Sequence, residues 1–414
     1  MALTVRSLAE HADPDAALAA YHRVDAAAFG SAPDPSVLEA KRPLVEPDRW
    51  LLASLDDEPC GGVGSFPFEL TVPGGSTVPV SGVADVGVLP THRRRGVLRT
   101  LLQRQLDELA ERGDVAAVLH ASEAGIYRRF GFGPATRWRH VDIDVRGAAF
   151  APGWPDPGGR YRMLPRDEAL APCAEAHERA RLARAGGLSR SEAWWRVVLG
   201  EVPLYLGGGR DRHVVLHADD RGEVDGYAIY SVREDWSGGR AGHTLHASEV
   251  VAADERVELG LWRTLLDHDL VERATGPLPV DHTLWDVLVD PRRARVRWEQ
   301  DLLWARPLDV PAALSARTYA ADGSVVLDVL DRFRPDTAGR FELGAEQGKA
   351  SCEPTTRPAE LRLDVSDLAA CWLGDASVRR LVRAGRVEEL AEGAAARADA
   401  MFATERAPWC WVRF

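Results

Sequence analysis

The stretch VADVGVLPTHRRRGVLRTLL, residues 83–102, joins a strand-like apolar run to an amphipathic helix through a loop of three arginines and a glycine. Apolar side chains recur at three- and four-residue spacings from Val97 to Leu109, which predicts a helix over 97–112. The first turn of a helix leaves backbone N–H groups unpaired, and Gly96 lets an anion approach them without a Cβ in the way. Arginine adds charge-assisted bonds to phosphate oxygens. The stretch therefore indicates either a solvated turn or a seat for a phosphate-bearing ligand.

The length and composition limit the function classes that remain. The chain has 414 residues, which favours two or three domains. Its net charge of -12 makes nucleic-acid binding improbable, because phosphate contacts need a basic face, and suits either a cationic ligand or plain solubility. No apolar run is long enough to span a membrane, and the N-terminal residues have no secretory-signal pattern. Five scattered cysteines without CxxC spacing predict free thiols and a cytoplasmic location.

Turn signals and periodicity divide the chain into three regions. The residues before about 145 alternate strand-like runs with helices, and the Pro- and Gly-rich stretch FAPGWPDPGGRY, 150–161, is typical of a linker. After it, strands are expected at HVVLHADD, GYAIYSV and HTLHASEVVA, followed by a helix near VELGLWRTLLDHDL and a further apolar run, TLWDVLV. The region from Arg297 onward is predicted to alternate strands with turns through AELRLDVSDLAACWLG and to end in two helices within 376–403. The aromatic tail APWCWVRF is expected to be held in place, because burying three aromatic rings is favourable.

Strand, arginine–glycine loop, helix, strand and then the tyrosine-bearing segment HASEAGIYRRFGFGPAT, 120–136, follow one another in this order. This succession resembles the GCN5-related N-acetyltransferases. The sequences of three segments are similar to those of the enhanced intracellular survival (Eis) members from actinobacteria: FELTVPGG, VLPTHRRRGVLRTLL and LHASEAGIYRRFGFGPAT. Arg93 and Gly96 fit the loop pattern of the superfamily, whereas Leu98 replaces its last small residue, as in the Eis-like members.

The resemblance implies an α+β chain of two tandem GCN5-related acetyltransferase folds followed by a sterol-carrier-protein-like α/β domain. The expected division is 1–150 with the acetyl-CoA site, 151–296 as a second acetyltransferase-like domain without a cofactor loop, and 297–414 as the sterol-carrier-like domain that supplies the C-terminal carboxylate. The implied activity is acetyl-CoA-dependent N-acetyl transfer to amines of cationic substrates such as aminoglycosides, at more than one position. A hexamer of identical chains is also implied, without a metal.

The resemblance also assigns site residues. Tyr127 is expected to act as general acid and the terminal carboxylate of Phe414 as general base, although spacing alone equally fits a tyrosine packed on Phe130. Asp25 is expected to face the cationic substrate, or to be an ordinary surface acid. The expected acetyl-CoA contacts are Val86, Gly87, Val88, Arg94, Arg95, Gly96, Val97, Leu98, Arg99, Ser122 and Glu123. Arg413, beside the expected base, would repel a cation if it turned inward.

Other patterns are weaker, and rival functions stay open. His243, His246 and Glu249 could hold a metal only on a helix, whereas the surrounding alternation predicts a strand. GGVG at 61–64 lacks the following helix and the ribose-binding acid of a dinucleotide site. The acceptor could also be a lysine of a protein or peptide. From another class, the chain could be a noncatalytic lipid- or ligand-binding protein that uses its C-terminal domain.

Overall fold

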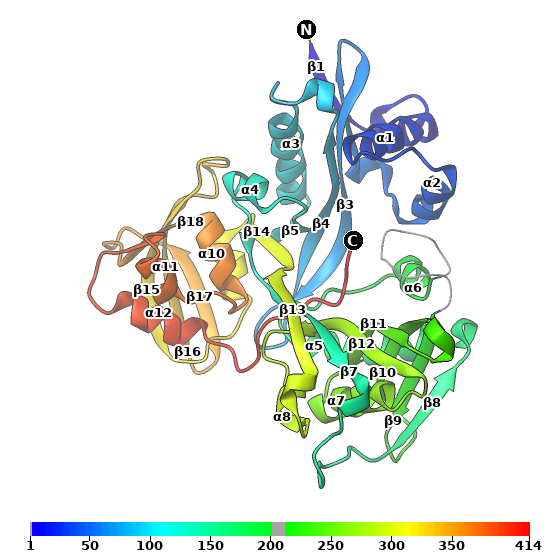
Figure 1. Ribbon diagram of the computed structural model, residues 1–414. Helices are drawn as coiled ribbons and strands as arrows, with labels where there is room; N and C mark the ends of the chain where they lie inside the picture. Colours follow the sequence, from blue (N-terminus) through cyan, green and yellow to red (C-terminus); the bar gives the residue numbers. More distant parts are fainter. Residues whose placement is uncertain (1, 201–211) are drawn as a thin grey trace. The chain divides into compact units, whose positions relative to one another are not determined.

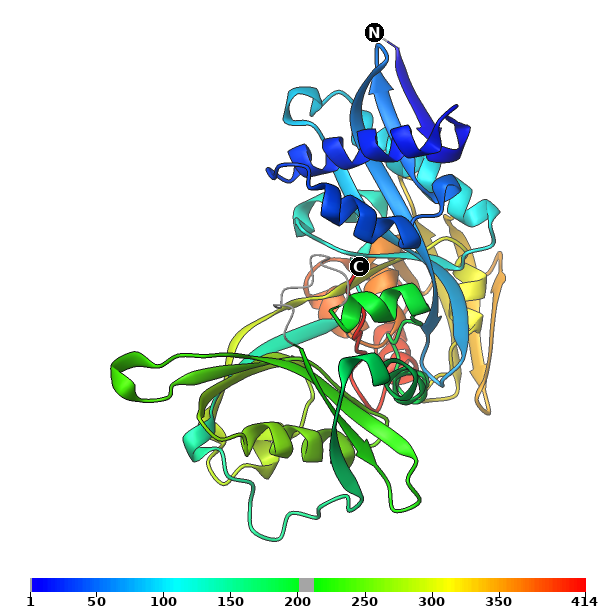
Figure 2. The same cartoon turned by 90° about the vertical axis from the view of Figure 1, so that its right-hand side faces the viewer.

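The computed structural model describes residues 2–200 and 212–414, which divide into two compact units (Figures 1 and 2). Unit 1 comprises residues 1–135, 303–404 and 413–414, and unit 2 comprises residues 136–302 and 405–412. Three sheets account for the named strands, two in unit 1 and one in unit 2. The α+β class with two acetyltransferase-like sheets and a third, smaller sheet is confirmed, while the domain boundaries named from the sequence stay predictions.

The first sheet of unit 1 has seven strands in the order β1 (Leu3–Ser7), β2 (Leu51–Leu55), β3 (Glu58–Thr71), β4 (Thr77–Val88), β5 (Ala116–His120), β14 (Leu303–Pro307) and β6 (Gly133–Pro134). Its strands pair antiparallel except β4 and β5, which run parallel and are joined by a helix, as a crossover requires. The sheet is completed by β14, which the chain contributes far downstream and which pairs with both β5 and β6.

Helices cover both faces of this sheet: α1 (Pro14–Ala28), α2 (Pro35–Lys41), α3 (Val97–Glu111) and α4 (Ala124–Tyr127). Successive residues of a strand point to opposite faces. A side chain at Gly61 would meet Val97 of α3, whereas one at the next position, Gly62, would collide with Tyr21 of α1. Helices α3 and α1 therefore pack on opposite faces, and the two glycines allow both to approach closely (Figures 1 and 2). The predicted helix over 97–112 is observed as α3 (Val97–Glu111), in which Leu101, Leu102, Leu106 and Leu109 are fully buried.

The second sheet of unit 1 has the order β17 (Lys349–Pro354), β16 (Gly339–Glu346), β15 (Gly323–Leu330), β18 (Leu361–Asp364) and β19 (Val387–Glu389). Its helices are α9 (Val310–Ser315), α10 (Val365–Trp372), α11 (Val378–Arg383) and α12 (Ala394–Phe402). The expectation of strands and turns through residues 359–374 was wrong for VSDLAACW, which forms α10. Asp364 caps this helix, and every residue of the helix is buried. A short apolar run that is buried on all sides cannot be told from a core strand by its periodicity, which explains the wrong expectation. A Cβ at Gly133 would overlap the carbonyl of Ser366 in α10, which explains one glycine of the RRFGFG turn.

Unit 2 is built on a sheet of the order β13 (Ala294–Asp301), β7 (Arg137–Asp144), β12 (Val271–Pro279), β11 (His243–Ala252), β10 (Val224–Arg233), β9 (His213–Ala218) and β8 (Arg160–Leu164). Its helices are α5 (Leu170–Leu182), α6 (Glu192–Val198), α7 (Glu255–Leu266) and α8 (Leu284–Val287). The strand β12 was not expected, because it contains two prolines, which are uncommon inside a sheet. The apolar run TLWDVLV contains the short helix α8.

Candidate active site

The arginine–glycine loop places an uncapped helix N-terminus beside strand β4. A short turn, Pro90–His92, leaves the strand, and Gly96 occupies the N-cap position of α3 with φ of +84°, a left-handed conformation that glycine adopts without strain. No side chain caps α3, so the backbone N–H groups of its first turn point outward without an internal partner. The positive end of the helix dipole and the neighbouring arginines make this end of α3 suited to an anion.

Strand β4 opens away from β5 beside this helix end. The two strands pair only where Val80, Ser81 and Gly82 face residues 116–118. Toward β3, the register shifts between Gly62 and Gly64, so that one residue of β3 faces two of β4. Asp85 lies in this bulge with φ of +49°, in the left-handed region that is costly for a residue with a Cβ. The end of β4 from Val86 to Val88 is thereby available along one edge to an extended ligand.

A cavity of about 920 Å³ runs from this helix end along the edge of β4. All the acetyl-CoA contacts named from the sequence line it except Arg95: Val86, Gly87, Val88, Arg94, Gly96, Val97, Leu98, Arg99, Ser122 and Glu123. Sequence reasoning missed several lining residues: Ala28, Phe29, His92, Ile126, Arg129 and Phe130. Arg129 and Phe130 stand in the quoted RRFGFG motif, which signalled a turn but not which side chains face the ligand. The size of the cavity, the glycines of its rim and the arginines in its lining fit a long anion such as acetyl-CoA.

Tyr127 forms part of the cavity wall at the end of α4. Its side chain is 5% exposed, and Ser122 hydrogen-bonds to its phenol. Burial raises the pKa of Tyr127 above its ordinary value, Ser122 lowers it and the nearby carboxylate of Glu123 raises it. The ring lies edge-on to Phe132 with 6.1 Å between centroids, so its aromatic neighbour is not Phe130, as the packing alternative assumed. The phenol remains protonated over the neutral range and can donate a proton into the cavity.

The C-terminal residue is seated on the same sheet. The ring of Phe414 lies 4.7 Å from that of His120 at the end of β5 and 5.1 Å from that of Phe68 on β3. A Cβ at Gly82 of β4 would come within 2.7 Å of this ring, so glycine is required there. The preceding Trp409 and Trp411 are buried within unit 2, as expected for a tail that is held in place.

Asp25 is buried beneath β4 and does not line the cavity. Its side chain is 4% exposed, which contradicts the surface-acid alternative, and its Oδ1 would lie 3.7 Å from a Cβ at Gly87. Lys41 forms an ion pair with Asp85 in the bulge, and its ammonium group lies 4.8 Å from the centre of the Trp50 ring. Burial lowers the pKa of Lys41 to about 8, while Asp25 raises it. Burial likewise raises the pKa of Asp25, whereas Lys41 and His22 lower it.

The other candidate patterns have different partners. His246 contacts the Thr275 hydroxyl, Glu249 pairs with Arg190, and His243 accepts from the backbone N–H of Asp235, all along or beside β11. Within residues 2–200 and 212–414, no group of three or more metal-ligating side chains is present. In the same part of the chain, no helix has the length and hydropathy needed to cross a bilayer.

Comparisons with known proteins agree with this geometry. The acetyltransferase (GNAT) domain family matches residues 13–135, a second family with the same description matches 186–307, and the sterol carrier protein domain family matches 310–411. An uncharacterised N-acetyltransferase of Streptomyces avermitilis is 42% identical over 84% of this chain and 84% of its own length. The N-acetyltransferase Eis of Mycobacterium tuberculosis is 36% identical over 92% of this chain and 93% of its own.

A solved structure extends the likeness to three dimensions. The crystal structure of Eis1 from Mycobacterium abscessus superimposes with a TM-score of 0.85 at 35% identity, covering 99% of this chain and 100% of that one. The fold, the domain families and relatives that cover nearly the whole chain all agree. The chain therefore belongs to the Eis family of GCN5-related N-acetyltransferases and is an acyltransferase.

Proposed function

We propose that the enzyme transfers the acetyl group of acetyl-CoA to amines of small polycationic substrates such as aminoglycosides, at more than one position. The cavity that joins the uncapped end of α3 to Tyr127 carries this proposal, because it brings a phosphate seat and a proton donor into one wall. The net charge of -12 favours the approach of a polycation over that of an anionic acceptor.

Different residues of unit 1 bind different parts of acetyl-CoA. The first-turn N–H groups of α3 and the side chains of Arg94 and Arg99 hold the pyrophosphate with charge-assisted bonds in place of water, while the expected contact of Arg95 stays a prediction because Arg95 does not line the cavity. The edge of β4 from Val86 to Val88 pairs with the extended pantetheine arm, as an added strand would. Ser122 and Glu123 close the far side of the cavity, next to the acid.

Two groups move protons during transfer. The carboxylate of Phe414 accepts a proton from the attacking amine, directly or through water, while the nitrogen forms its bond to the thioester carbonyl carbon. When the carbon–sulfur bond breaks, the Tyr127 phenol donates its proton to the departing thiolate, whose conjugate thiol is the stronger acid by about 1.5 pKa units in reference compounds. The role of Asp25 toward the substrate stays a prediction, and its buried position beside Gly87 places it outside the lining of this cavity.

Release of free CoA thiol tests the proposal. The wild-type chain is expected to release thiol with kanamycin, and mass spectrometry of the product is expected to show more than one added acetyl group. A variant without Phe414 should bind acetyl-CoA normally but release thiol at least 100-fold more slowly. Release with a lysine peptide alone would assign a protein acceptor instead, and release by the Phe414-deleted variant at the wild-type rate would remove the terminal carboxylate from the mechanism.

The assembly and location of the enzyme are part of the same proposal. The hexamer implied by the family predicts a particle of six times the 45.2 kDa chain, which light scattering measures directly. All five cysteines are free and buried, in keeping with the cytoplasmic location expected from the sequence. A mass of one or two chains at micromolar concentration would contradict the hexamer.

A further inference from the structure

A second cavity, of about 870 Å³, lies in unit 1 next to the acetyl-CoA cavity. It opens at the carboxyl ends of the parallel strands β15 and β18, where Leu330 is paired with Asp364, and is closed by the turn after α4 and by the loop that precedes β19. None of the site residues named from the sequence lines it.

Arginine dominates the charged wall of this cavity in an otherwise acidic protein. Its lining includes Arg128, Arg129, Arg332, Arg362 and Arg386. Among the residues that the structure describes, Arg129 and Arg332 form no ion pair, whereas the others have carboxylate partners. Two guanidinium groups in this wall are therefore without a counter-charge.

The acids of the wall are already engaged. Asp367, with a 1% exposed side chain, alone serves both Arg128 at 3.1 Å and Arg386 at 2.9 Å. Asp364 caps α10 through the backbone N–H and the hydroxyl of Ser366. The lining holds five arginines and four carboxylates, Asp331, Asp364, Asp367 and Glu388, and Glu388 pairs with Arg362 at 3.1 Å, so the arginines exceed the acids by one.

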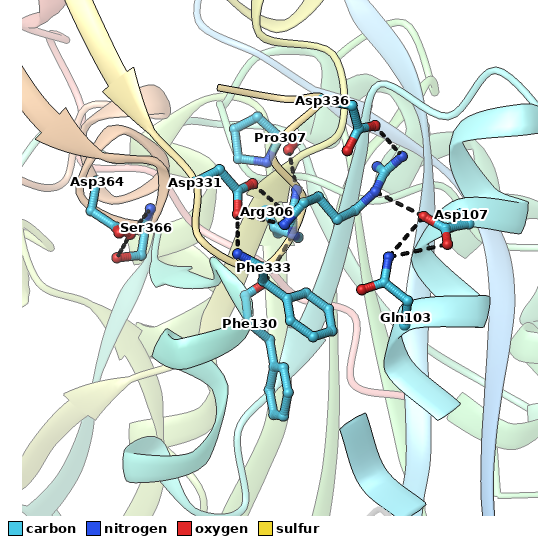
Figure 3. A network of polar contacts seen from close by, with 11 residues as sticks. Gln103, Asp107, Phe130, Arg306, Pro307, Asp331, Phe333, Asp336, Asp364 and Ser366 are labelled. Atoms are coloured by element: carbon cyan, nitrogen blue, oxygen red, sulfur yellow. Dashed lines mark hydrogen bonds and ion pairs between the residues drawn. The ribbon is translucent and has the colours of Figure 1, made fainter. Parts of the chain in front are cut away.

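A buried network of polar contacts includes Asp331 and Phe333, which line the cavity (Figure 3). The guanidinium of Arg306 lies 2.5 Å from the carboxylate of Asp331 and donates to the carbonyl oxygens of Phe130 and Pro307. The other oxygen of Asp331 accepts from the backbone N–H of Phe333. Both charged side chains are fully buried, so this pair orders the loop that carries Arg332.

The two cavities share one wall. Phe130 and Phe333 meet edge-on, with 4.9 Å between their centroids, and Arg129 lines both cavities. The guanidinium of Arg99, which lines the acetyl-CoA cavity, also lies over the ring of Phe333, 5.0 Å from its centre. The second cavity is thus a separate space that is in contact with the first.

We propose that this arginine-lined cavity is a second anion site, which binds a small molecule bearing phosphate groups separately from acetyl-CoA. Guanidinium groups that converge from three segments match a ligand with several charged oxygens, and arginine forks suit phosphate geometry. A ligand there would engage Arg332, Arg129 and the two arginines that now share Asp367.

Calorimetric titration with inorganic pyrophosphate at low salt tests the second site, with and without saturating CoA. The wild type is expected to bind two pyrophosphates alone and one in the presence of CoA. Arg332→Ala should weaken the CoA-insensitive site about tenfold, the loss of one charge-assisted contact. Arg240→Ala is the matched control, because Arg240 is also exposed and lies on unit 2, outside this cavity.

The outcomes separate this proposal from the proposed function. Loss of all pyrophosphate binding on adding CoA, or equal affinities for the wild type and Arg332→Ala, would overturn the second site. Failure of CoA to displace either pyrophosphate would instead count against the coenzyme seat on α3, while the effect of Arg332→Ala would still support the second site. Unchanged thermal unfolding of both variants establishes that each is folded.

Discussion

Each of the two acetyltransferase folds has a helix that connects two parallel strands, α3 between β4 and β5 and α7 between β11 and β12. The N-termini of these two helices are capped differently. Between β4 and α3 lie residues 89–96, with the arginines and Gly96, whereas only Ala253 and Asp254 separate β11 from α7. Gly96 leaves the N-terminus of α3 uncapped, while the Asp254 carboxylate accepts from the N–H of Arg256 in α7. In unit 2 a carboxylate of the protein itself caps the helix, whereas in unit 1 the helix end is left without a side-chain cap, as the proposed binding of a phosphate there requires.

The same contrast holds at the bulge and at the short helix. The bulge in β4 carries Asp85 in a left-handed conformation, paired with Lys41, whereas the register shift of β11 involves no residue of positive φ. The short helix α4 ends in Tyr127, and α8, in the corresponding position after β12, ends in Val287. The two folds thus differ at a loop, a bulge and one side chain, which are the features on which the proposed activity rests.

The largest effect on the reaction rate is expected from removing the hydroxyl at the end of α4, since the corresponding helix of the second fold, α8, ends in a residue without one. Tyr127→Phe removes only the hydroxyl and should lower kcat by about 10² to 10⁴-fold, because the thiolate then leaves without a proton donor. The KM for acetyl-CoA should change little. Because burial raises the pKa of Tyr127, the wild-type kcat should show no alkaline decline up to about pH 10, where an ordinary tyrosine ionises. A decline centred between pH 8 and 9, or a fully active variant, would exclude Tyr127 as the acid.

The bulge provides the next largest effect. Lys41→Met leaves Asp85 and the buried Asp25 without their cation, and should lower the free energy of unfolding by about 3 kcal/mol in urea titrations. Lys349→Met is the matched control, since Lys349 is exposed on β17, and should change it by less than about 0.5 kcal/mol. Equal stability of the two variants would show that the Lys41 pair does not support β4.

Transferring the cap of α7 to α3 should weaken coenzyme binding more modestly. In Gly96→Asp, the carboxylate satisfies the first-turn N–H groups and repels phosphate, so the KM for acetyl-CoA should rise about tenfold relative to Gly96→Asn. Asparagine has the same shape and tolerates positive φ, so the comparison removes the conformational cost of losing glycine. Equal KM values in the two variants would mean that phosphate does not bind at this helix end.

The smallest effect belongs to unit 2. Asp254→Ala removes the cap of α7 and should cost about 1 kcal/mol in the free energy of unfolding, without altering the KM for acetyl-CoA. Thermal unfolding and initial-rate kinetics measure the two quantities on one sample. A changed KM would indicate that the second fold takes part in coenzyme binding.

Sequence reasoning located features that are encoded locally. The periodicity of α3, the glycine before it and the tyrosine after β5 predict most of the cavity wall, because each depends on a few neighbouring residues. The motif resemblance supplied the remaining roles, including that of Phe414, which no local pattern indicates.

Features that depend on distant parts of the chain could not be predicted. The insertion of β14 between β5 and β6 and the burial of α10 against Gly133 involve segments more than 150 residues apart in sequence, which no periodicity connects. Likewise, the burial of Asp25 follows from its position under Gly87, and the second cavity from the approach of Phe333 to Phe130. Each of these is a property of packing rather than of any one segment.

The scarcity of lysine has a consequence for the chemical labelling of the enzyme. Of the two lysines in the sequence, Lys41 is enclosed and held in an ion pair, so Lys349 offers the only accessible side-chain amine. Lys349 therefore offers a single side-chain attachment point for amine-reactive dyes, on a strand remote in sequence from the first acetyltransferase fold.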